Sequence, residues 1–267
     1  MKKEYDNYIF DLYGTLIDIH TDEEQSLLWG KMTDYLKLHF SSEYTSKVLR
    51  KRYLEICKEE EDKLQKENGA TWPEIRIEKV WTRLICEGRK ASLQNLDPES
   101  AQAGDCDEDS PEIRKLCVFF REASRDKFVV YEGVRQVFEK LKADGKHIFL
   151  LSNAQRVFTE KELSDAGLTD YFEDIFISSD KGIKKPQKEF LEKLLKDNSL
   201  SFDKCVMIGN DIFSDVGVAF KNGVDSIFLN TYDYSEKKID EELTELGIKG
   251  SKFMPLIVED GDIRKIL

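Results

Sequence analysis

The residues most able to do chemistry begin at Asp11, which directly follows the apolar residues 8–10. This apolar run predicts a β-strand that would deliver Asp11 to the carboxyl edge of a sheet, where open α/β sheets bind their ligands. Gly14 follows and permits a tight turn, and Thr15 adds a hydroxyl and an N–H group. An aspartate held in this way can act as a covalent nucleophile, as it does in aspartyl-phosphate enzymes.

Polar residues follow two further predicted strands. Ser152 and Asn153 come after the apolar run 148–151, and a hydroxyl at the end of a strand can hydrogen-bond an anionic oxygen. Lys185 stands before Pro186, which holds it in an extended or turn conformation. The ammonium group of this lysine could neutralise the aspartate nucleophile together with a bound phosphoryl group.

A pair of carboxylates follows the apolar run 205–208. Asp211 and Asp215 are four residues apart, so they would share one face if the chain turns into a helix there. Two carboxylates so close disfavour each other unless a cation lies near them. A hard divalent ion such as Mg²⁺, which binds one or two protein carboxylates and retains water, is the natural partner.

Each of these residues also has a purely structural interpretation. Asp11 could cap a turn, and Lys185 could be a solvated member of a basic loop. Ser152 or Asn153 could cap a helix, and Asp211 could do the same.

In their order along the chain, the four motifs resemble those of the haloacid dehalogenase (HAD) superfamily. The first motif of its phosphatases is Asp-x-Asp-Gly-Thr, and here Tyr13 replaces the second acid. The second is a Ser or Thr after a strand, and the third is a lysine such as Lys185 before proline. The fourth is Gly-Asp-x-x-x-Asp, with Asn210 here at the glycine position. The resemblance covers nearly the whole chain.

The resemblance implies a Mg²⁺-dependent phosphatase that acts on a small phosphorylated metabolite through an aspartyl-phosphate intermediate. The residues assigned to catalysis are Asp11, Lys185 and Tyr13. The groups assigned to the phosphoryl oxygens come from Leu12, Tyr13, Thr15, Ser152, Asn153 and Lys185. The Mg²⁺ ligands are expected from Asp11, the backbone carbonyl of Tyr13, Asp211 and Asp215, the last of which could instead position Lys185.

Tyr13 leaves two alternative functions open. The second aspartate of family phosphatases is the general acid and base, whereas a tyrosine, with a reference pKa of ~10, is mostly protonated at neutral pH. A substrate with a good leaving group, such as an acyl phosphate, would need less protonation. L-2-haloacid dehalogenases of the superfamily carry tyrosine at this position and need no metal, but they lack the acids that Asp211 and Asp215 retain. In a dehalogenase, a substrate-binding arginine would be expected from Arg50, Arg52 or Arg83. The third hypothesis is a non-catalytic protein that binds a phospho-ligand.

The elements that must position these residues follow from the apolar pattern. From residue 129 onward, short apolar runs alternate with helical stretches, which predicts an α/β fold with a doubly wound, mainly parallel, Rossmann-like sheet. Within 21–128, apolar residues recur at helical spacing, interrupted by a polar loop at 91–111. We therefore expect a core of residues 1–20 and 129–267 and an inserted all-helical domain of residues 21–128. The position of the insert resembles the helical cap of the family.

Composition limits the possible partners. The 267 residues carry a net charge of −12, which disfavours nucleic acid and anionic membranes as partners. No apolar run approaches the ~20 residues of a membrane helix, and the first strand begins too early for a signal peptide. The five cysteines include no Cys-x-x-Cys pair, so a structural zinc site is not expected. We predict a soluble cytoplasmic protein that is a monomer or homodimer.

Overall fold

The computed structural model describes residues 4–94 and 107–267, with the side chains of residues 90–94 excepted. The chain divides into two compact units. The sheet unit consists of Met1–Ile19, Ala70–Glu74 and Phe128–Leu267. The helical unit consists of His20–Gly69 and Ile75–Lys127.

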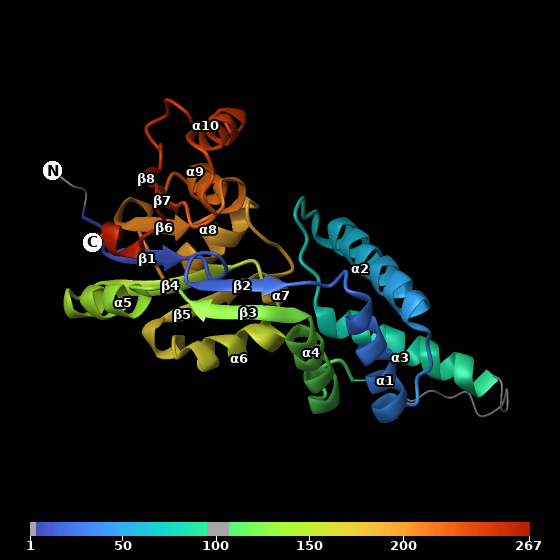
Figure 1. Ribbon diagram of the computed structural model, residues 1–267. Coiled ribbons are helices and arrows are strands. Elements are labelled where there is room, and N and C mark those ends of the chain that lie inside the picture. Colours follow the sequence, from blue (N-terminus) through green and yellow to red (C-terminus); the bar gives the residue numbers. More distant parts are fainter. Residues whose placement is uncertain (1–3, 95–106) are drawn as a thin grey trace. The chain divides into compact units, whose positions relative to one another are not determined.

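The sheet unit is built on a six-stranded sheet of order β5-β4-β1-β6-β7-β8 (Figure 1). Its strands are β1 (Asn7–Phe10), β4 (His147–Ser152), β5 (Asp174–Ile177), β6 (Cys205–Gly209), β7 (Asp225–Leu229) and β8 (Leu256–Val258). All neighbouring strands are parallel, and Phe10 pairs with both Leu150 and Ile208. The strand order reverses at β1, so ligands are expected beside its carboxyl end.

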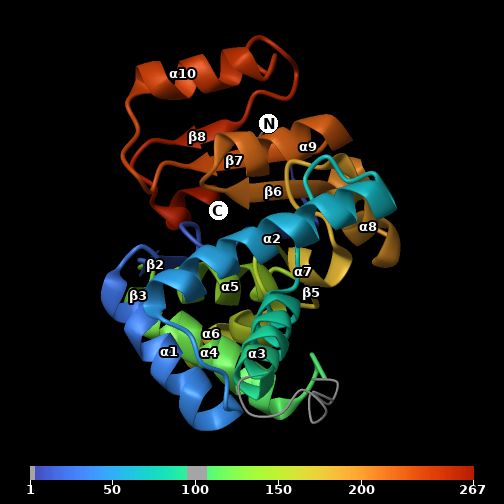
Figure 2. The ribbon, with the colours of Figure 1, turned by 90° about the vertical axis from the view of Figure 1, so that its right-hand side faces the viewer.

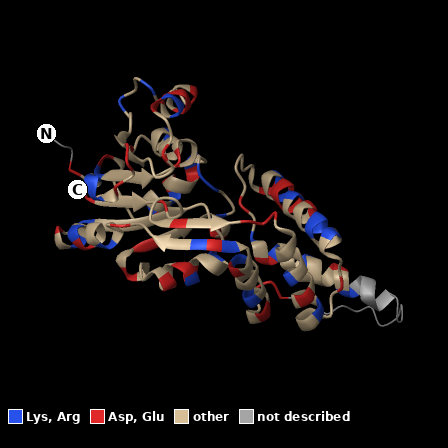
Figure 3. Cartoon of the chain, viewed as in Figure 1, with Lys and Arg blue, Asp and Glu red and all other residues tan. Residues whose placement is uncertain are grey.

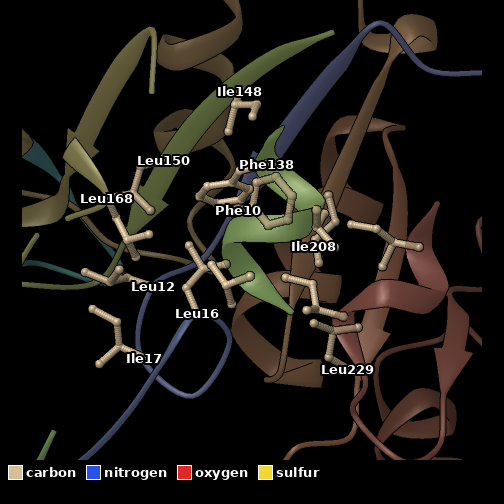
Figure 4. Packing of buried hydrophobic residues seen from close by; sticks show 14 of the residues in the cluster. Phe10, Leu12, Leu16, Ile17, Phe138, Ile148, Leu150, Leu168, Ile208 and Leu229 are labelled. Carbon is tan, nitrogen blue, oxygen red and sulfur yellow. The ribbon is translucent and has the colours of Figure 1, made fainter. Parts of the chain in front are cut away.

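Helices cover both faces of this sheet because successive residues of a strand point to opposite sides. Phe10 joins a cluster with α5 (Val134–Ala143) and α6 (Arg156–Ala166), part of which is drawn in Figure 4. Ile9 joins a second cluster with α8 (Lys188–Asp197) and α9 (Gly217–Asn222). The prediction of a doubly wound parallel sheet is therefore confirmed. The remaining helical elements of this unit are η1 (Thr169–Tyr171), α7 (Ser178–Lys181), η2 (Phe202–Lys204), η3 (Ile212–Val216), α10 (Glu236–Glu245) and η4 (Ile263–Ile266).

The described residues of the helical unit form four helices, which are shown from a second direction in Figure 2. They are α1 (Ser26–Phe40), α2 (Ser46–Asn68), α3 (Ile77–Gln94) and α4 (Pro111–Ser124). Their buried faces meet in an aromatic cluster, in which the ring of Trp81 lies 5.3 Å from Tyr53 and 5.1 Å from Phe120. Residues 95–106 of the predicted polar loop lie outside the described residues. None of the helices in the described ranges is long and apolar enough to cross a membrane.

Two segments that connect the units form strands that we did not predict. β2 (Ile17–Thr21) and β3 (Arg125–Val130) pair as a separate two-stranded sheet. β2 alternates in polarity over only five residues, and β3 has three charged residues followed by three apolar ones, so neither pattern distinguishes a strand from a linker.

Residues Ala70–Glu74 belong to the sheet unit although they lie between α2 and α3. The N–H group of Lys184 donates to the carbonyl of Trp72 at 3.0 Å. The Glu74 carboxylate accepts hydrogen bonds from Ser178 at 3.0 Å and from Gln155 at 2.9 Å. The predicted division of the chain did not anticipate this segment, because its partners are more than 80 residues away in sequence.

Candidate active site

Asp11 continues the ladder of β1 by one residue and then presents its side chain at the carboxyl edge of the sheet. Its N–H group donates to the carbonyl of Ile208 at 2.9 Å, which fixes the backbone against β6. The side chain is buried, and its Oδ2 atom lies 3.3 Å from the Thr15 hydroxyl. A backbone pinned on the sheet therefore holds the predicted nucleophile.

Lys185 joins the third motif to the first. Its Nζ atom donates to Asp11 Oδ1 at 2.6 Å, to Asp215 Oδ1 at 2.7 Å and to the carbonyl of Leu151 at 2.8 Å. An ammonium group has three protons, so all three are committed. Burial alone would lower the pKa of Lys185, but the two carboxylates outweigh it and raise the pKa, which keeps the side chain protonated.

Asp215 has both carboxylate oxygens engaged. Oδ1 accepts from Lys185, and Oδ2 accepts from the N–H group of Asp211 at 3.0 Å. Its approach requires a glycine at position 209, because a Cβ atom there would lie 2.1 Å from Asp215 Oδ2. Burial raises the pKa of Asp215 to about 7, reinforced by Asp11 and opposed by the Lys185 ammonium. Asp215 is thus placed to hold the lysine.

The two neighbours at the end of β6 point to different places. Asp211 is exposed, and its Oδ1 atom accepts from Ser214 N at 2.6 Å, which caps η3. Asn210 is buried, and its Oδ1 atom accepts from the Thr15 hydroxyl at 3.1 Å. Our prediction named Asp211 and missed Asn210. The available signal was position, since Asn210 is the first residue after the strand.

The second motif supplies one free hydroxyl and one backbone clamp. The Oγ atom of Ser152 is buried and has no hydrogen-bond partner within the described part of the chain. A buried polar group without a partner is costly, so this hydroxyl suits a ligand oxygen. The amide of Asn153 bonds both backbone groups of Lys185, accepting from its N–H at 2.8 Å and donating to its carbonyl at 3.0 Å. Asn153 therefore orients the lysine.

Tyr13 directs its hydroxyl toward helix α6. The hydroxyl donates to the carboxylate of Glu162 and lies 3.1 Å from the Thr159 hydroxyl. The Leu12 side chain is buried in the core, and its carbonyl accepts from Leu16 N at 2.8 Å in the turn that follows. Leu12 and Tyr13 thus lie in the loop of the first motif, as expected. The contact of the Tyr13 hydroxyl with Glu162 and Thr159 was not predicted.

The geometry described above coincides with a known family. Residues 5–223 match the haloacid dehalogenase-like hydrolase family. The chain belongs to this family. The four motifs of this HAD hydrolase thus converge on one end of its parallel sheet, as the resemblance implied.

Named relatives of this HAD hydrolase include phosphatases. It is 24% identical over 108 residues to the glyceraldehyde 3-phosphate phosphatase of Pyrococcus furiosus, covering 40% of this chain and 45% of the relative. It is 30% identical over 119 residues to the phosphoglycolate phosphatase of Colwellia psychrerythraea, covering 45% and 50%. The matches therefore span about half the length of these two relatives.

Solved structures share the fold at low identity. A 2-haloacid dehalogenase from Pseudomonas syringae pv. Tomato DC3000 superimposes with a TM-score of 0.59 at 17% identity, over 96% of this chain and 94% of that one. A HAD phosphatase from Thermococcus onnurineus gives a TM-score of 0.54 at 16% identity, over 98% and 97%. At these identities the likeness establishes the fold and leaves the reaction open.

The oxygen atoms around the nucleophile fit the chemistry of Mg²⁺. Asp11 offers a carboxylate and Asn210 an amide oxygen, and both accept from the single Thr15 hydroxyl. Within residues 4–94 and 107–267, no group of three or more His, Cys, Asp or Glu side chains could hold a metal. Mg²⁺ does not require one, because it typically takes one or two carboxylates and keeps several waters.

The three arginines considered for a dehalogenase all pair with glutamates of the helical unit. Arg50 pairs with Glu24. Arg52 contacts Glu87 at 2.7 Å, and Arg83 contacts Glu60 at 2.6 Å. Any of them would have to leave such a partner to bind a substrate carboxylate.

Proposed function

We propose that this HAD hydrolase is a Mg²⁺-dependent phosphatase that acts on a small phosphorylated metabolite through an aspartyl-phosphate intermediate on Asp11. The observation that carries the proposal is the contact of 2.6 Å between Lys185 Nζ and Asp11 Oδ1 inside a buried cluster. A buried ammonium beside the nucleophile favours binding of a dianionic phosphoryl group. The phosphatase names of the two relatives agree with this chemistry.

In the proposed reaction, a carboxylate oxygen of Asp11 attacks phosphorus. A bond forms between this oxygen and phosphorus, and the bond from phosphorus to the leaving oxygen breaks with its electron pair. Water then attacks the phosphorus of the aspartyl phosphate, and the bond between phosphorus and the Asp11 oxygen breaks with its electron pair. This step restores the carboxylate and releases hydrogen phosphate, and one proton of the water passes to solvent. The Ser152 hydroxyl would donate to a phosphoryl oxygen, and the positive charge of Lys185 would attract the phosphoryl group, together with the backbone N–H groups of Leu12, Tyr13 and Thr15.

Mg²⁺ would be held by Asp11 and the backbone carbonyl of Tyr13, with Asn210 or Asp211 as a further oxygen ligand. When bound, the ion would neutralise negative charge between the nucleophile and the phosphoryl group. Asp215 would keep Lys185 in place, since both of its oxygens are already engaged.

The test is phosphate release from a panel of small phosphate monoesters and acyl phosphates, with Mg²⁺ and with EDTA. We expect metal-dependent release from the wild type and none from Asp11→Asn, which keeps a hydrogen-bond acceptor for Lys185 but lacks the nucleophilic charge. Turnover by that variant would refute the proposal.

The same proteins test the two alternatives. Halide release from 2-haloacids that is insensitive to EDTA would identify a dehalogenase, which Tyr13 alone favours. Tight phosphate binding without turnover of any substrate would identify a non-catalytic phospho-ligand-binding protein.

A further inference from the structure

Tyr13 occupies the position of the acid in the first motif, but its proton is already committed. A phenol has one proton, and the Tyr13 hydroxyl donates it to the buried carboxylate of Glu162. The neighbouring Thr159 hydroxyl donates its own proton to the carbonyl of Gln155 at 2.8 Å. Both partners lie on α6 and are buried, so the tyrosine oxygen is bound to a rigid element.

The other protons of the cluster are committed as well. All three protons of Lys185 are used, and the single Thr15 proton is shared between Asp11 and Asn210. The Ser152 hydroxyl remains for a phosphoryl oxygen. Apart from the Ser152 hydroxyl, the hydroxyl and ammonium groups of the first, second and third motifs therefore have all their protons committed within the described residues.

We propose that Glu162 is a positioning residue that keeps the Tyr13 phenol from acting as an acid, so that the site acts on phosphate esters whose leaving group departs unprotonated. Acyl phosphates and aryl phosphates have this chemistry, because their leaving oxygen is stabilised as a carboxylate or phenolate. The bond to phosphorus breaks, and the electron pair leaves with that oxygen without a proton from the enzyme. This inference rests on the proposed function.

The test is the dependence of kcat/KM on the leaving group. We would measure phosphate release from substituted phenyl phosphates, from nitrophenyl to alkylphenyl, and plot log kcat/KM against the pKa of the leaving phenol. General acid catalysis contributes about 10²–10⁴ in rate. We therefore expect log kcat/KM of the wild type to fall steeply as the pKa of the leaving phenol rises. For the poorest leaving groups, kcat/KM should be about 10²-fold or more lower than in an enzyme that has a general acid.

Two variants of Tyr13 test whether this residue determines the slope of log kcat/KM against the pKa of the leaving group. Tyr13→Asp restores the carboxyl group of the family motif and should flatten the slope. Tyr13→Phe removes the hydroxyl and should leave the slope as steep as in the wild type. The slope does not depend on the fraction of active protein, so partial misfolding of a variant changes only the intercept.

The role of Glu162 is tested by variants that remove its hydrogen bond with the Tyr13 hydroxyl. Glu162→Ala should give a slope flatter than that of the wild type, and the double variant Glu162→Ala/Tyr13→Phe should restore the steep slope. Glu162→Gln keeps an acceptor oxygen and should stay close to the wild type. A merely structural role for Glu162 would change the intercept of all these plots and none of the slopes.

The outcomes separate this inference from the proposed function. A flat slope in the wild type, or a steeper slope in Tyr13→Phe, would overturn the inference while the phosphatase stands. Absence of release from every phosphate, or release that persists in Asp11→Asn, would overturn both.

Discussion

Two clusters of ion pairs, one on each unit, lie in opposite environments. In the sheet unit, the Lys185 side chain is 1% exposed and serves two buried carboxylates, Asp11 and Asp215. On the helical unit, Arg52 is 25% exposed and contacts glutamates at 2.7 and 2.8 Å. Basic and acidic residues alternate along α2 in Figure 3, as expected of a solvated surface.

The cluster of Lys185, Asp11 and Asp215 differs from the pairs of Arg52 in burial more than in the number of contacts, and burial decides how much each charge contributes. Exposed pairs contribute about 0–1 kcal/mol and are screened by salt. Removing one member of a buried pair lowers the free energy of unfolding by about 3–5 kcal/mol, because the remaining charge is buried without a partner and without solvation. One ammonium between two ionised carboxylates also leaves one excess negative charge. A bound cation, or protonation of one of the carboxylates, would neutralise it.

The largest effect is expected at Lys185. Lys185→Met leaves Asp11 and Asp215 buried without a cation, so the free energy of unfolding should fall by about 3–5 kcal/mol and turnover should disappear. Lys184→Met is the control, since that lysine is 30% exposed and its nearest carboxylate oxygen is 4.0 Å away. We expect a change within about 0.5 kcal/mol for the control. Equal losses in urea unfolding would show that burial does not distinguish the two sites.

Two glycines offer a test of how closely the cluster is packed. Gly209→Ala would place a Cβ atom 2.1 Å from Asp215 Oδ2, and such overpacking should cost about 1–3 kcal/mol and lower turnover. Gly30→Ala lies within α1, where a Cβ atom meets nothing within 4 Å. Helix propensity should make that variant more stable by roughly 0.5–1 kcal/mol. Thermal unfolding of both variants measures the contrast, and a stable, active Gly209→Ala would contradict it.

The third test decides which residue after β6 binds the metal. If Asn210 is the ligand, Asn210→Ala should raise the Mg²⁺ concentration for half-maximal activity about tenfold or more, equivalent to about 1.4 kcal/mol. Asp211→Ala should change it little, and should destabilise the protein by about 1 kcal/mol through loss of the η3 cap. The reverse pattern in a Mg²⁺ titration would restore Asp211 as the ligand.

The smallest effect is expected on the helical unit and depends on pH. Hydrogen bonds from Arg52, and then from Arg83, lower the pKa of Glu59 from 4.5 to about 2. Because the folded pKa lies below the unfolded value, the contribution of Glu59 to stability is present at neutral pH and is lost as the pH falls from about 4.5 toward 2. Glu59→Gln should therefore lose less stability than the wild type between pH 5 and pH 2 in urea unfolding. Identical pH slopes would show that this network does not stabilise the fold.

Local patterns predicted the sheet and most of the site. The apolar runs before Asp11, Ser152 and Asn210 are strands, and parallel strands bring their carboxyl ends to one edge. The helices of residues 26–124 follow equally from apolar periodicity. The predicted roles in catalysis and metal binding remain predictions, since an apolar pattern indicates which element a residue lies on and not which reaction it takes part in.

Spacing misled us where the local backbone is irregular. Asp211 and Asp215 would share a face on an α-helix, but Asp211 caps a π-helix, η3, and only Asp215 turns into the cluster. That choice depends on Gly209 leaving room for one carboxylate and on Lys185 attracting it. Neither condition is visible in a four-residue spacing.

The sequence alone determined the doubly wound fold, the order of the motifs and the departure at Tyr13. The fold follows from the periodicity of apolar residues, and the motifs follow from residue identity. Only the tertiary structure decided that the Tyr13 hydroxyl contacts Glu162, that Asn210 lies beside Thr15 and that residues 70–74 join the sheet unit. Such contacts join residues up to about 195 positions apart. They depend on how packed elements meet, which no local pattern encodes.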